Sequence, residues 1–214
     1  MRNVLADLQL ELEGSVAMTM RMGEALDRCQ ADAGNEHEAL LLRLGLPVGK
    51  YWICKRTPNH AYEAMECLGG NGVTEDFILA RLYRDAPINA IWEGSGNIQA
   101  LDMLRAVSKS PEVLDAWFDE LASTRSTSPV LDRAVTSIKD MLSDADSAEY
   151  RARRLVEGLA LTMQASLLLR ADCPAVAEAF IASRLDHTAD RNYGTLPVGC
   201  DLDTILERAD PLRG

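Results

Sequence analysis

Apolar residues recur at helical spacing along almost the whole chain. From about Asn3 to Arg28 they fall at Val4, Leu5, Leu8, Leu12, Val16, Met20 and Leu26. After Ser128 they form a second regular stripe, at Val130, Leu131, Ala134, Val135, Ile138, Met141 and Leu142. This period is that of amphipathic helices, and no segment alternates with the period of two that a strand would show. The sequence therefore predicts an all-α fold, packed as an antiparallel helical bundle because the connections are short.

Turn residues predict where the helices begin and end. A polar stretch around residue 34 ends the first helix, and Gly45 with Pro47 predicts a kink or a first turn in the next segment. Thr57 before Pro58 is arranged as an N-cap with proline at the first helical position, so a separate helix is expected there, ending at the glycines after Leu68. Ser-Pro pairs at 110–111 and 128–129 predict further helix starts, with helices over 148–170, about 174–187 and near the C-terminus.

Composition narrows the class of protein. A formal net charge of −11, shared by residues 1–108 and 109–214, disfavours loose binding to nucleic acid or anionic membrane. The chain has no apolar run long enough to cross a bilayer and no signal-peptide layout, so a soluble, cytoplasmic protein is expected. Irregular spacing and scarce histidines predict reduced thiols and no metal site for the five cysteines, Cys29, Cys54, Cys67, Cys173 and Cys200.

The first glycine-rich break, at residues 69–72, follows a predicted helix. Glycine tolerates positive φ and lets another backbone or a ligand approach closely. The local sequence favours a simple helix end with a tight turn. The alternative is a cradle in which exposed backbone N–H groups hold a phosphate.

The second break, "WEGSGNIQ" at residues 92–99, carries a carboxylate. Ser95 is a plausible N-cap for a helix from about residue 96 to 107, whose free N–H groups suit an anion. One face of this helix is expected to carry Ile98, Leu101, Leu104 and Val107. Desolvation of Glu93 beside Trp92 would make it a base able to remove a weakly acidic C–H proton. Equally open is the alternative that Glu93 is solvated or only interacts with the helix N-terminus.

Three motifs in order, "ECLGGNG", "YRDAPINAI" and "WEGSGNIQ", resemble the C-terminal helical domain of the acyl-CoA dehydrogenase family. That domain carries Q-x-x-G-G-x-G, then R-D-A, then [YW]-E-G-[ST]-x-x-x-Q. The amino-acid sequence of residues 50–107, and that of the second half, is most similar to the AidB branch, which is linked to the DNA alkylation response. The resemblance therefore implies a family bundle over residues 1–108 and an AidB-like helical extension over residues 109–214.

The resemblance also implies roles for single residues. Glu93 falls on the base that removes the α-proton of an acyl-CoA thioester while the β-hydride moves to FAD. Ser95 and Asn97 fall where the family contacts FAD. Gly69 and Gly70 fall on the turn that meets the FAD pyrophosphate of a neighbouring subunit, which implies a homo-oligomer.

Several departures from the family bear on these roles. Gly72 completes the glycine motif, but Glu66 stands where many relatives have Gln, and Val73 stands where an aromatic often follows. By the resemblance, the N-terminal helical domain, the middle β-domain and the first bundle helix of the family are expected to be absent from this sequence. We therefore expect a fragment, a truncated gene product or one part of a split enzyme. On its own, the chain is expected to bind FAD weakly and to show no turnover.

Two other functions compete with this enzyme part. A DNA-associated module would use phosphate contacts from Arg151, Arg153, Arg154, Arg170, Arg184 and Arg191. The acidic balance of that half favours arginines paired with neighbouring carboxylates instead. A catalytically silent helical domain is the other competitor, because a missing bundle helix would leave an apolar groove for a second copy or a partner.

Overall fold

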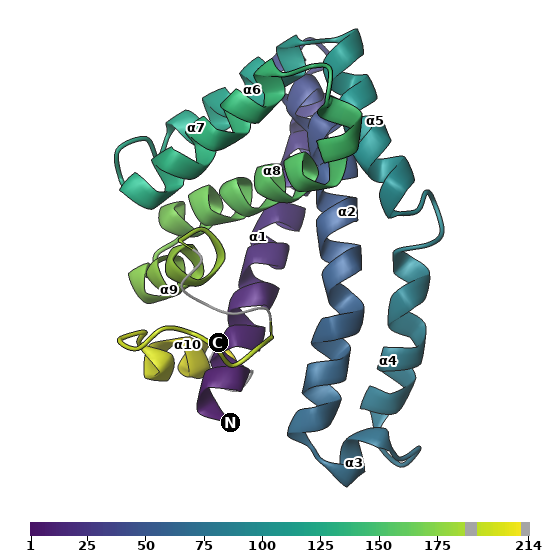
Figure 1. Ribbon diagram of the computed structural model, residues 1–214, viewed down its shortest axis with the longest axis vertical. Helices are drawn as coiled ribbons and strands as arrows, with labels where there is room; N and C mark the ends of the chain where they lie inside the picture. Colours follow the sequence, from purple (N-terminus) through teal and green to yellow (C-terminus); the bar gives the residue numbers. More distant parts are fainter. Residues whose placement is uncertain (187–191, 211–214) are drawn as a thin grey trace.

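The computed structural model describes residues 1–186 and 192–210 (Figure 1). Over these residues the chain forms helices and no strand, which confirms the all-α prediction. The helices are α1 (Arg2–Ala31), α2 (Glu36–Cys67), α3 (Gly70–Val73), α4 (Ile78–Asn89), α5 (Gly96–Lys109), α6 (Glu112–Ala122), α7 (Pro129–Ser143), α8 (Ala148–Arg170), α9 (Pro174–Arg184) and α10 (Leu202–Arg208). The predicted end of α9 at His187 lies outside the described residues.

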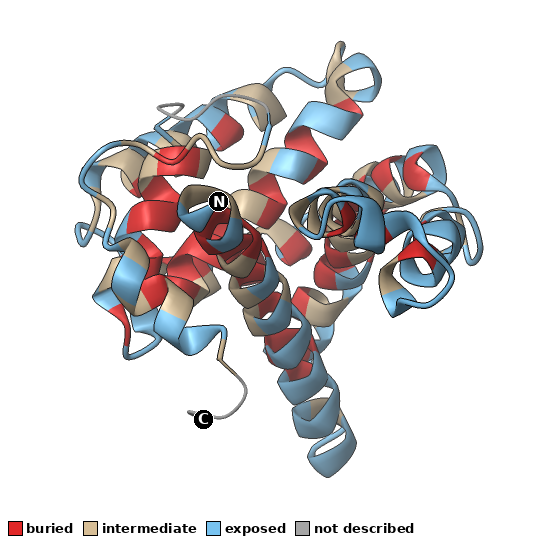
Figure 2. Ribbon diagram, turned by 90° about the horizontal axis from the view of Figure 1, so that it is seen from below, coloured by how far each residue is buried: buried red, intermediate tan, exposed pale blue. Residues whose placement is uncertain are grey.

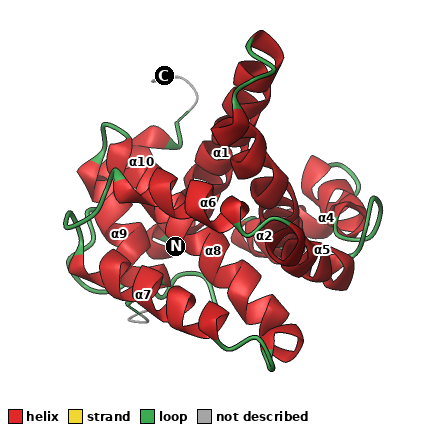
Figure 3. Cartoon of the chain, turned by 90° about the horizontal axis from the view of Figure 1, so that it is seen from above, coloured by secondary structure: helices red, strands yellow, loops and turns green. Residues whose placement is uncertain are grey.

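Helix α2 is the central element of the fold. It packs against α1, α4, α5, α6 and α8. In Figure 1 α1, α2 and α4 lie lengthwise next to one another, and α8 crosses α1 and α2. Seen from above, α4 and α5 lie on one side of α2, and α7, α9 and α10 on the other (Figure 3). The antiparallel bundle is thus formed by α1, α2 and α4, and α8 lies across it.

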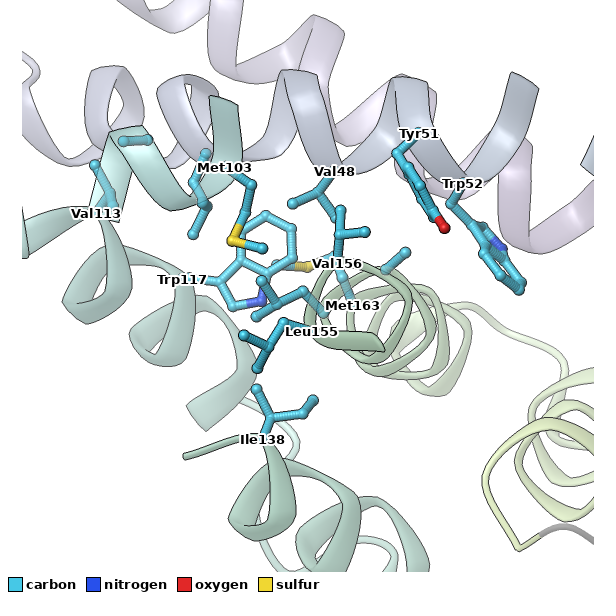
Figure 4. Packing of buried hydrophobic residues seen from close by; sticks show 14 of the residues in the cluster. Val48, Tyr51, Trp52, Met103, Val113, Trp117, Ile138, Leu155, Val156 and Met163 are labelled. Atoms are coloured by element: carbon cyan, nitrogen blue, oxygen red, sulfur yellow. The ribbon is translucent and has the colours of Figure 1, made fainter. Parts of the chain in front are cut away.

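Two apolar clusters form the core. The larger one surrounds Trp117 and draws side chains from α1, α2, α5, α6, α7 and α8 (Figure 4). The smaller one surrounds Phe180 and joins α1, α7, α8, α9 and α10. Because the larger cluster contains residues from both halves of the chain, the two halves pack on one shared core. A division at residue 108 into bundle and extension stays a prediction.

The prediction that a separate helix starts at Thr57 was wrong. α2 runs unbroken through Pro47 and Pro58, and its N-cap is Asn35, whose side chain accepts from the Glu38 N–H at 3.3 Å. The hydroxyl of Thr57 donates to a carbonyl of its own helix, that of Ile53, at 2.7 Å. An interior proline costs a helix about 3 kcal/mol. The packing of α2 against five other helices offsets that cost.

The apolar stripe of α1 is a second departure from the sequence pattern. Most of its large residues are exposed, namely Leu5, Leu12, Val16, Met20 and Leu26. Figure 2 shows exposed and buried residues along the helix that begins at the N-terminus. The buried face includes only Leu8 of the predicted stripe, and three of its residues are charged. Its members are Ala6, Asp7, Leu8, Leu10, Glu11, Gly14, Met18, Arg21, Met22 and Ala25. The charged residues are buried because each meets an oppositely charged side chain, which apolar periodicity does not register.

Other stripe predictions had mixed outcomes. In α5 the residues Ile98 and Leu101 are exposed, and the buried positions are Gly96, Ala100, Met103 and Ala106. In α7 the predicted stripe does face the core, with Leu131 and Ile138 buried. The predicted cap of α7 is also confirmed, because the Ser128 hydroxyl accepts from the Leu131 N–H at 3.4 Å.

A buried ion-pair network joins four helices. Arg21 of α1 donates to both oxygens of Glu38 on α2, at 2.8 and 3.1 Å, and to both oxygens of Glu120 on α6, at 2.9 Å each. Arg170 of α8 adds a bond to Glu120 at 2.6 Å, and Arg28 adds one to Glu38 at 2.6 Å. Burial alone would raise the pKa of Glu120, but the bonds from Arg21 and Arg170 lower it to about 2. This network holds α1 against the helices that cross it.

Candidate functional site

The site is built on the loop between α4 and α5. Two successive residues of this loop, Glu93 and Gly94, have left-handed backbones with φ of 54° and 99°. Glycine adopts this conformation freely, but glutamate does so at a cost of about 1 kcal/mol. A non-glycine residue is held there only when its surroundings fix the backbone.

Two side chains fix the loop by its carbonyl oxygens. Lys50 of α2 donates its ammonium group to the carbonyl oxygens of Trp92 and of Gly94, the latter at 3.0 Å. Gln99 of α5 donates Nε2 to the carbonyl oxygens of Glu93 at 2.9 Å and Gly94 at 3.2 Å. We call Lys50 and Gln99 the carbonyl clamp. A Cβ on residue 94 would lie 2.6 Å from Gln99 Nε2, so the clamp closes only over glycine.

Sequence reasoning did not identify Lys50. It lies 42 residues before Trp92, and its charge is one of several along a long helix. No local pattern marks a lysine that reaches the carbonyls of a distant loop. Gln99 was visible only as the last position of the family motif.

The carboxylate of Glu93 is exposed. Its neighbour Trp92 is 58% exposed and Ile91 is 61% exposed, so neither covers it. The side chain of Glu93 is thus open to solvent in this structure. Its role as a base stays a prediction.

The start of α5 lies beside an open depression of about 330 Å³. Ser95 is the N-cap residue, as predicted, although within the described residues its hydroxyl makes no capping hydrogen bond. Ser95 and Asn97 line the depression together with two cations, Lys55 of α2 and Arg153 of α8. Arg153 Nε donates to Asn97 Oδ1 at 2.9 Å. The rest of the lining is apolar or glycine, namely Pro58, Pro87, Ala90, Ile91 and Gly96, and its charged members among the described residues are both cations.

The glycines at 69–72 have different local roles. Gly69 has a φ of 58° and follows the end of α2, which fits the predicted helix end. Gly72 is buried, and a Cβ there would overlap the carbonyl group of Met65. A Cβ on Gly70 would meet open space. Glu66, in the last turn of α2, is exposed.

The two motifs lie at opposite ends of α4 (Figure 1). A helix of 12 residues is about 18 Å long, so Gly69 and Gly70 lie far from Glu93 within this chain. The structure thus groups Glu93, Ser95 and Asn97 at one place and the glycine turn with Glu66 at another.

Neither a metal site nor a membrane span stands out in the described residues. They contain no group of three His, Cys, Asp or Glu side chains placed to hold a metal ion. Their helices include none with the length and apolarity that crossing a bilayer requires.

The helical fold and the clamped W-E-G loop define one class of protein domain. Residues 1–108 match the family described as "Acyl-CoA dehydrogenase, C-terminal domain", and the chain belongs to this family. Among its relatives is AidB of Escherichia coli strain K12, which is 40% identical over 186 residues. That alignment covers 87% of this chain and 33% of AidB.

One further relative and one solved structure with a similar fold come from Caenorhabditis elegans. Acyl-CoA dehydrogenase family member 11 is 30% identical over 141 residues, covering 66% of this chain and 23% of the relative. The crystal structure of ACDH-11 in complex with C11-CoA has the same fold, with a TM-score of 0.67 at 23% identity. It aligns with 96% of this chain and 35% of its own. The chain spans about a third or less of the length of these relatives.

Proposed function

We propose that this chain is the C-terminal part of an FAD-dependent acyl-CoA dehydrogenase-like protein. Glu93 is the carboxylate base for α,β-dehydrogenation of an acyl-CoA thioester. One observation carries the proposal: in a chain of this family, the carbonyl clamp holds Glu93 in a left-handed conformation with its carboxylate exposed. A base acts on a C–H bond only when its oxygen is placed within reach of the proton.

The clamp performs the positioning that such a base needs. Lys50 and Gln99 hold backbone oxygens, so the carboxylate of Glu93 stays free to meet a substrate. Fixing the loop before the substrate arrives removes the entropy cost of ordering it during the reaction. A thioester chain and its flavin, once placed over Trp92 and Glu93, would also exclude water from the carboxylate.

The polar groups around the start of α5 fit a flavin nucleotide. The Ser95 hydroxyl, the Asn97 amide, Lys55 and Arg153 supply hydrogen-bond donors and positive charge. FAD, when bound, supplies the acceptor for the β-hydride. Residues that would hold it are Ser95 and Asn97 at this end and, by the family resemblance, Glu66, Gly69, Gly70 and Gly72 at the other.

The separation of the two motifs supports an assembly of several chains. The resemblance assigns the glycine turn to the FAD of a neighbouring subunit, and α4 separates that turn from Glu93. Gly70 leaves open space for an approaching ligand or chain. Glu66 is the exception in this set, because an exposed carboxylate near the turn disfavours a phosphate there.

The test is to produce the chain together with the N-terminal and middle domains of a full-length relative. We expect the assembly to bind FAD and to reduce a dye with acyl-CoA. Glu93→Gln should lower the rate of thioester oxidation at least about 100-fold while FAD stays bound. The proposal fails if neither the chain nor the assembly binds flavin, or if Glu93→Gln leaves the rate unchanged. The 214-residue chain alone is expected to hold FAD weakly and to show no turnover.

An interaction role is the second candidate, and one observation favours it. Of the 21 exposed large apolar side chains among the described residues, all but Tyr150 and Val198 lie in residues 1–108. A surface of this kind is typical of a region that another protein surface covers.

A DNA-binding role has less support. Arg151 pairs with Asp144, Arg170 with Glu120, and Arg184 with Asp7 and Glu11, so these guanidinium groups already have carboxylate partners. Arg191 lies outside the described residues. A salt-sensitive mobility shift of duplex DNA at low micromolar protein would reverse this ranking.

A further inference from the structure

Arg153 joins the two halves of the chain at the candidate cofactor site. It lies on α8, outside the residues 1–108 that match the family, and bonds to Asn97 of α5. We propose that Arg153 positions Asn97 so that the Asn97 amide donates to an anionic oxygen of the bound ligand. Arg153 is thus a positioning residue, and the inference rests on the proposed function because both concern the same site.

The chemistry of the pair fixes the orientation of the amide. A guanidinium group carries only donors, so the Asn97 atom that it meets has to be the side-chain oxygen. The distance from Arg153 Nε to Asn97 Oδ1 is 2.9 Å. The amide nitrogen then points away from Arg153 and presents its two N–H donors on the other side. Without Arg153 the amide is free to turn its oxygen toward the ligand, and an amide oxygen repels an anion.

The surroundings select the class of ligand. The depression beside Asn97 has a volume of about 330 Å³, at the lower end of the range for small-molecule sites. Two of its lining residues, Lys55 and Arg153, are cationic. The donors and the two cations of this lining suit the phosphate oxygens of a nucleotide.

The two neighbouring arginines of α8 are placed differently. Arg151 donates to the carbonyl oxygens of Met141 and Asp144, at 3.1 and 3.0 Å, and pairs with the Asp144 carboxylate. Arg154 lies on another face of α8 and lines a separate depression beside α7. Arg154 therefore serves as a matched control, because it is an exposed arginine at the next position of the same helix.

The experiment uses the 214-residue chain and ¹⁵N-resolved NMR of its side-chain amides. Inorganic pyrophosphate is the first probe, followed by ADP and FAD, and thermal melting confirms that each variant is folded. We expect a saturable shift of the Asn97 side-chain N–H signals in the wild type. Arg153→Met should weaken pyrophosphate binding about fivefold, since a lost charge-assisted hydrogen bond of this exposure corresponds to about 1 kcal/mol. Arg154→Met should change it less than twofold.

A third variant separates orientation from general charge. Asn97→Asp keeps an oxygen for Arg153 but replaces the amide donor with a second acceptor. It should retain the melting temperature of the wild type and lose the pyrophosphate response. The inference is overturned if the Asn97 side-chain signals show no saturable shift. It is also overturned if Arg153→Met and Arg154→Met weaken binding equally, or if Asn97→Asp binds like the wild type.

These outcomes remain distinct from failure of the proposed function. A pyrophosphate response that depends on Arg153, in an assembly that never oxidises a thioester, would sink the enzyme assignment and leave this inference standing. If the assembly oxidises a thioester with FAD and Arg153→Met keeps the flavin affinity of the wild type, the enzyme assignment stands and this inference is overturned.

Discussion

At the scale of single residues, the glycines between α2 and α4 are not equivalent. Gly72 is buried against the Met65 carbonyl, whereas a Cβ on Gly70 meets nothing within 4 Å. Gly70→Ala should therefore change the free energy of unfolding by less than about 1 kcal/mol, whereas Gly72→Ala should displace the turn and cost about 2 kcal/mol or more. Chemical denaturation of the two variants measures the difference, and equal losses would contradict it.

Gly70→Ala also tests whether the glycine turn contacts a flavin. If a neighbouring subunit's flavin approaches Gly70, Gly70→Ala should weaken FAD binding in the assembled protein while the melting temperature stays the same. A flavin affinity equal to that of the wild type would remove Gly70 from the proposed cofactor site.

The sequence predicted those features of the site that are local. Ser95 as the start of α5 and the helix end before Gly69 follow from capping and turn preferences within a few residues. Local preferences do not predict the contact of Lys50 with the loop or the bond from Arg153 to Asn97. Lys50 lies 42 residues from Trp92, and Arg153 lies 56 residues from Asn97. Pairing over such separations depends on how helices cross, which the periodicity of one helix does not contain.

At the scale of helices, the buried ion-pair network links stability to pH. The pKa of Glu120 lies at about 2 in the folded chain, below the ordinary value of 4.5 that applies to the unfolded chain. A group with a lowered folded pKa stabilises the fold above its unfolded pKa. The contribution of Glu120 is therefore complete above about pH 5 and is lost as the pH falls from there toward 2.

We expect Glu120→Gln to destabilise the chain by about 2 to 3 kcal/mol at neutral pH, because Arg21 and Arg170 lose a shared carboxylate. The difference from the wild type should shrink as the pH falls from 5 to 2. Urea unfolding at several pH values measures it. Glu24→Gln is the control, since Glu24 makes a half-exposed ion pair and should cost less than about 0.5 kcal/mol. A difference that stays constant with pH would contradict this account.

Helix α2 shows why element boundaries were harder to predict than element type. Proline and a preceding threonine predict a helix start, and at Ser128 the serine–proline pair does start α7. At Thr57 the same local pattern lies inside a helix that five others hold in place. The propensity of the residues is alike in both places, and tertiary packing decides between them.

At the scale of the whole molecule, the two halves of the chain differ in how many large apolar side chains they leave exposed, and most of these lie in residues 1–108. Helix α1 carries apolar residues on two faces. One face is buried, and the other is exposed and carries Leu12, Val16 and Met20. The sequence pattern identified the exposed stripe because it is the more regular one. Its exposure could not be read from the pattern, because periodicity marks an apolar face without stating what covers it.

We expect this face to drive self-association of the isolated chain. Val16→Glu combined with Met20→Glu should weaken association about tenfold or more, because charges would enter an apolar contact. Light scattering coupled to size exclusion measures it over a range of concentrations. Tyr150→Glu, at a side chain that is 94% exposed in the second half, is the control and should leave association unchanged. A wild type that stays monomeric at high concentration would rule out this role for the α1 face.

The carbonyl clamp has a consequence for how such a domain diverges. Lys50 and Gln99 hold oxygen atoms that every residue possesses, so the shape of the loop does not depend on the side chains at positions 92 and 93. Only Gly94 is constrained by its lack of a side chain. A single substitution of Glu93 would therefore remove the proposed base while the loop keeps its form. If Glu93 is the base, one residue separates a catalytic form of this domain from a purely structural one.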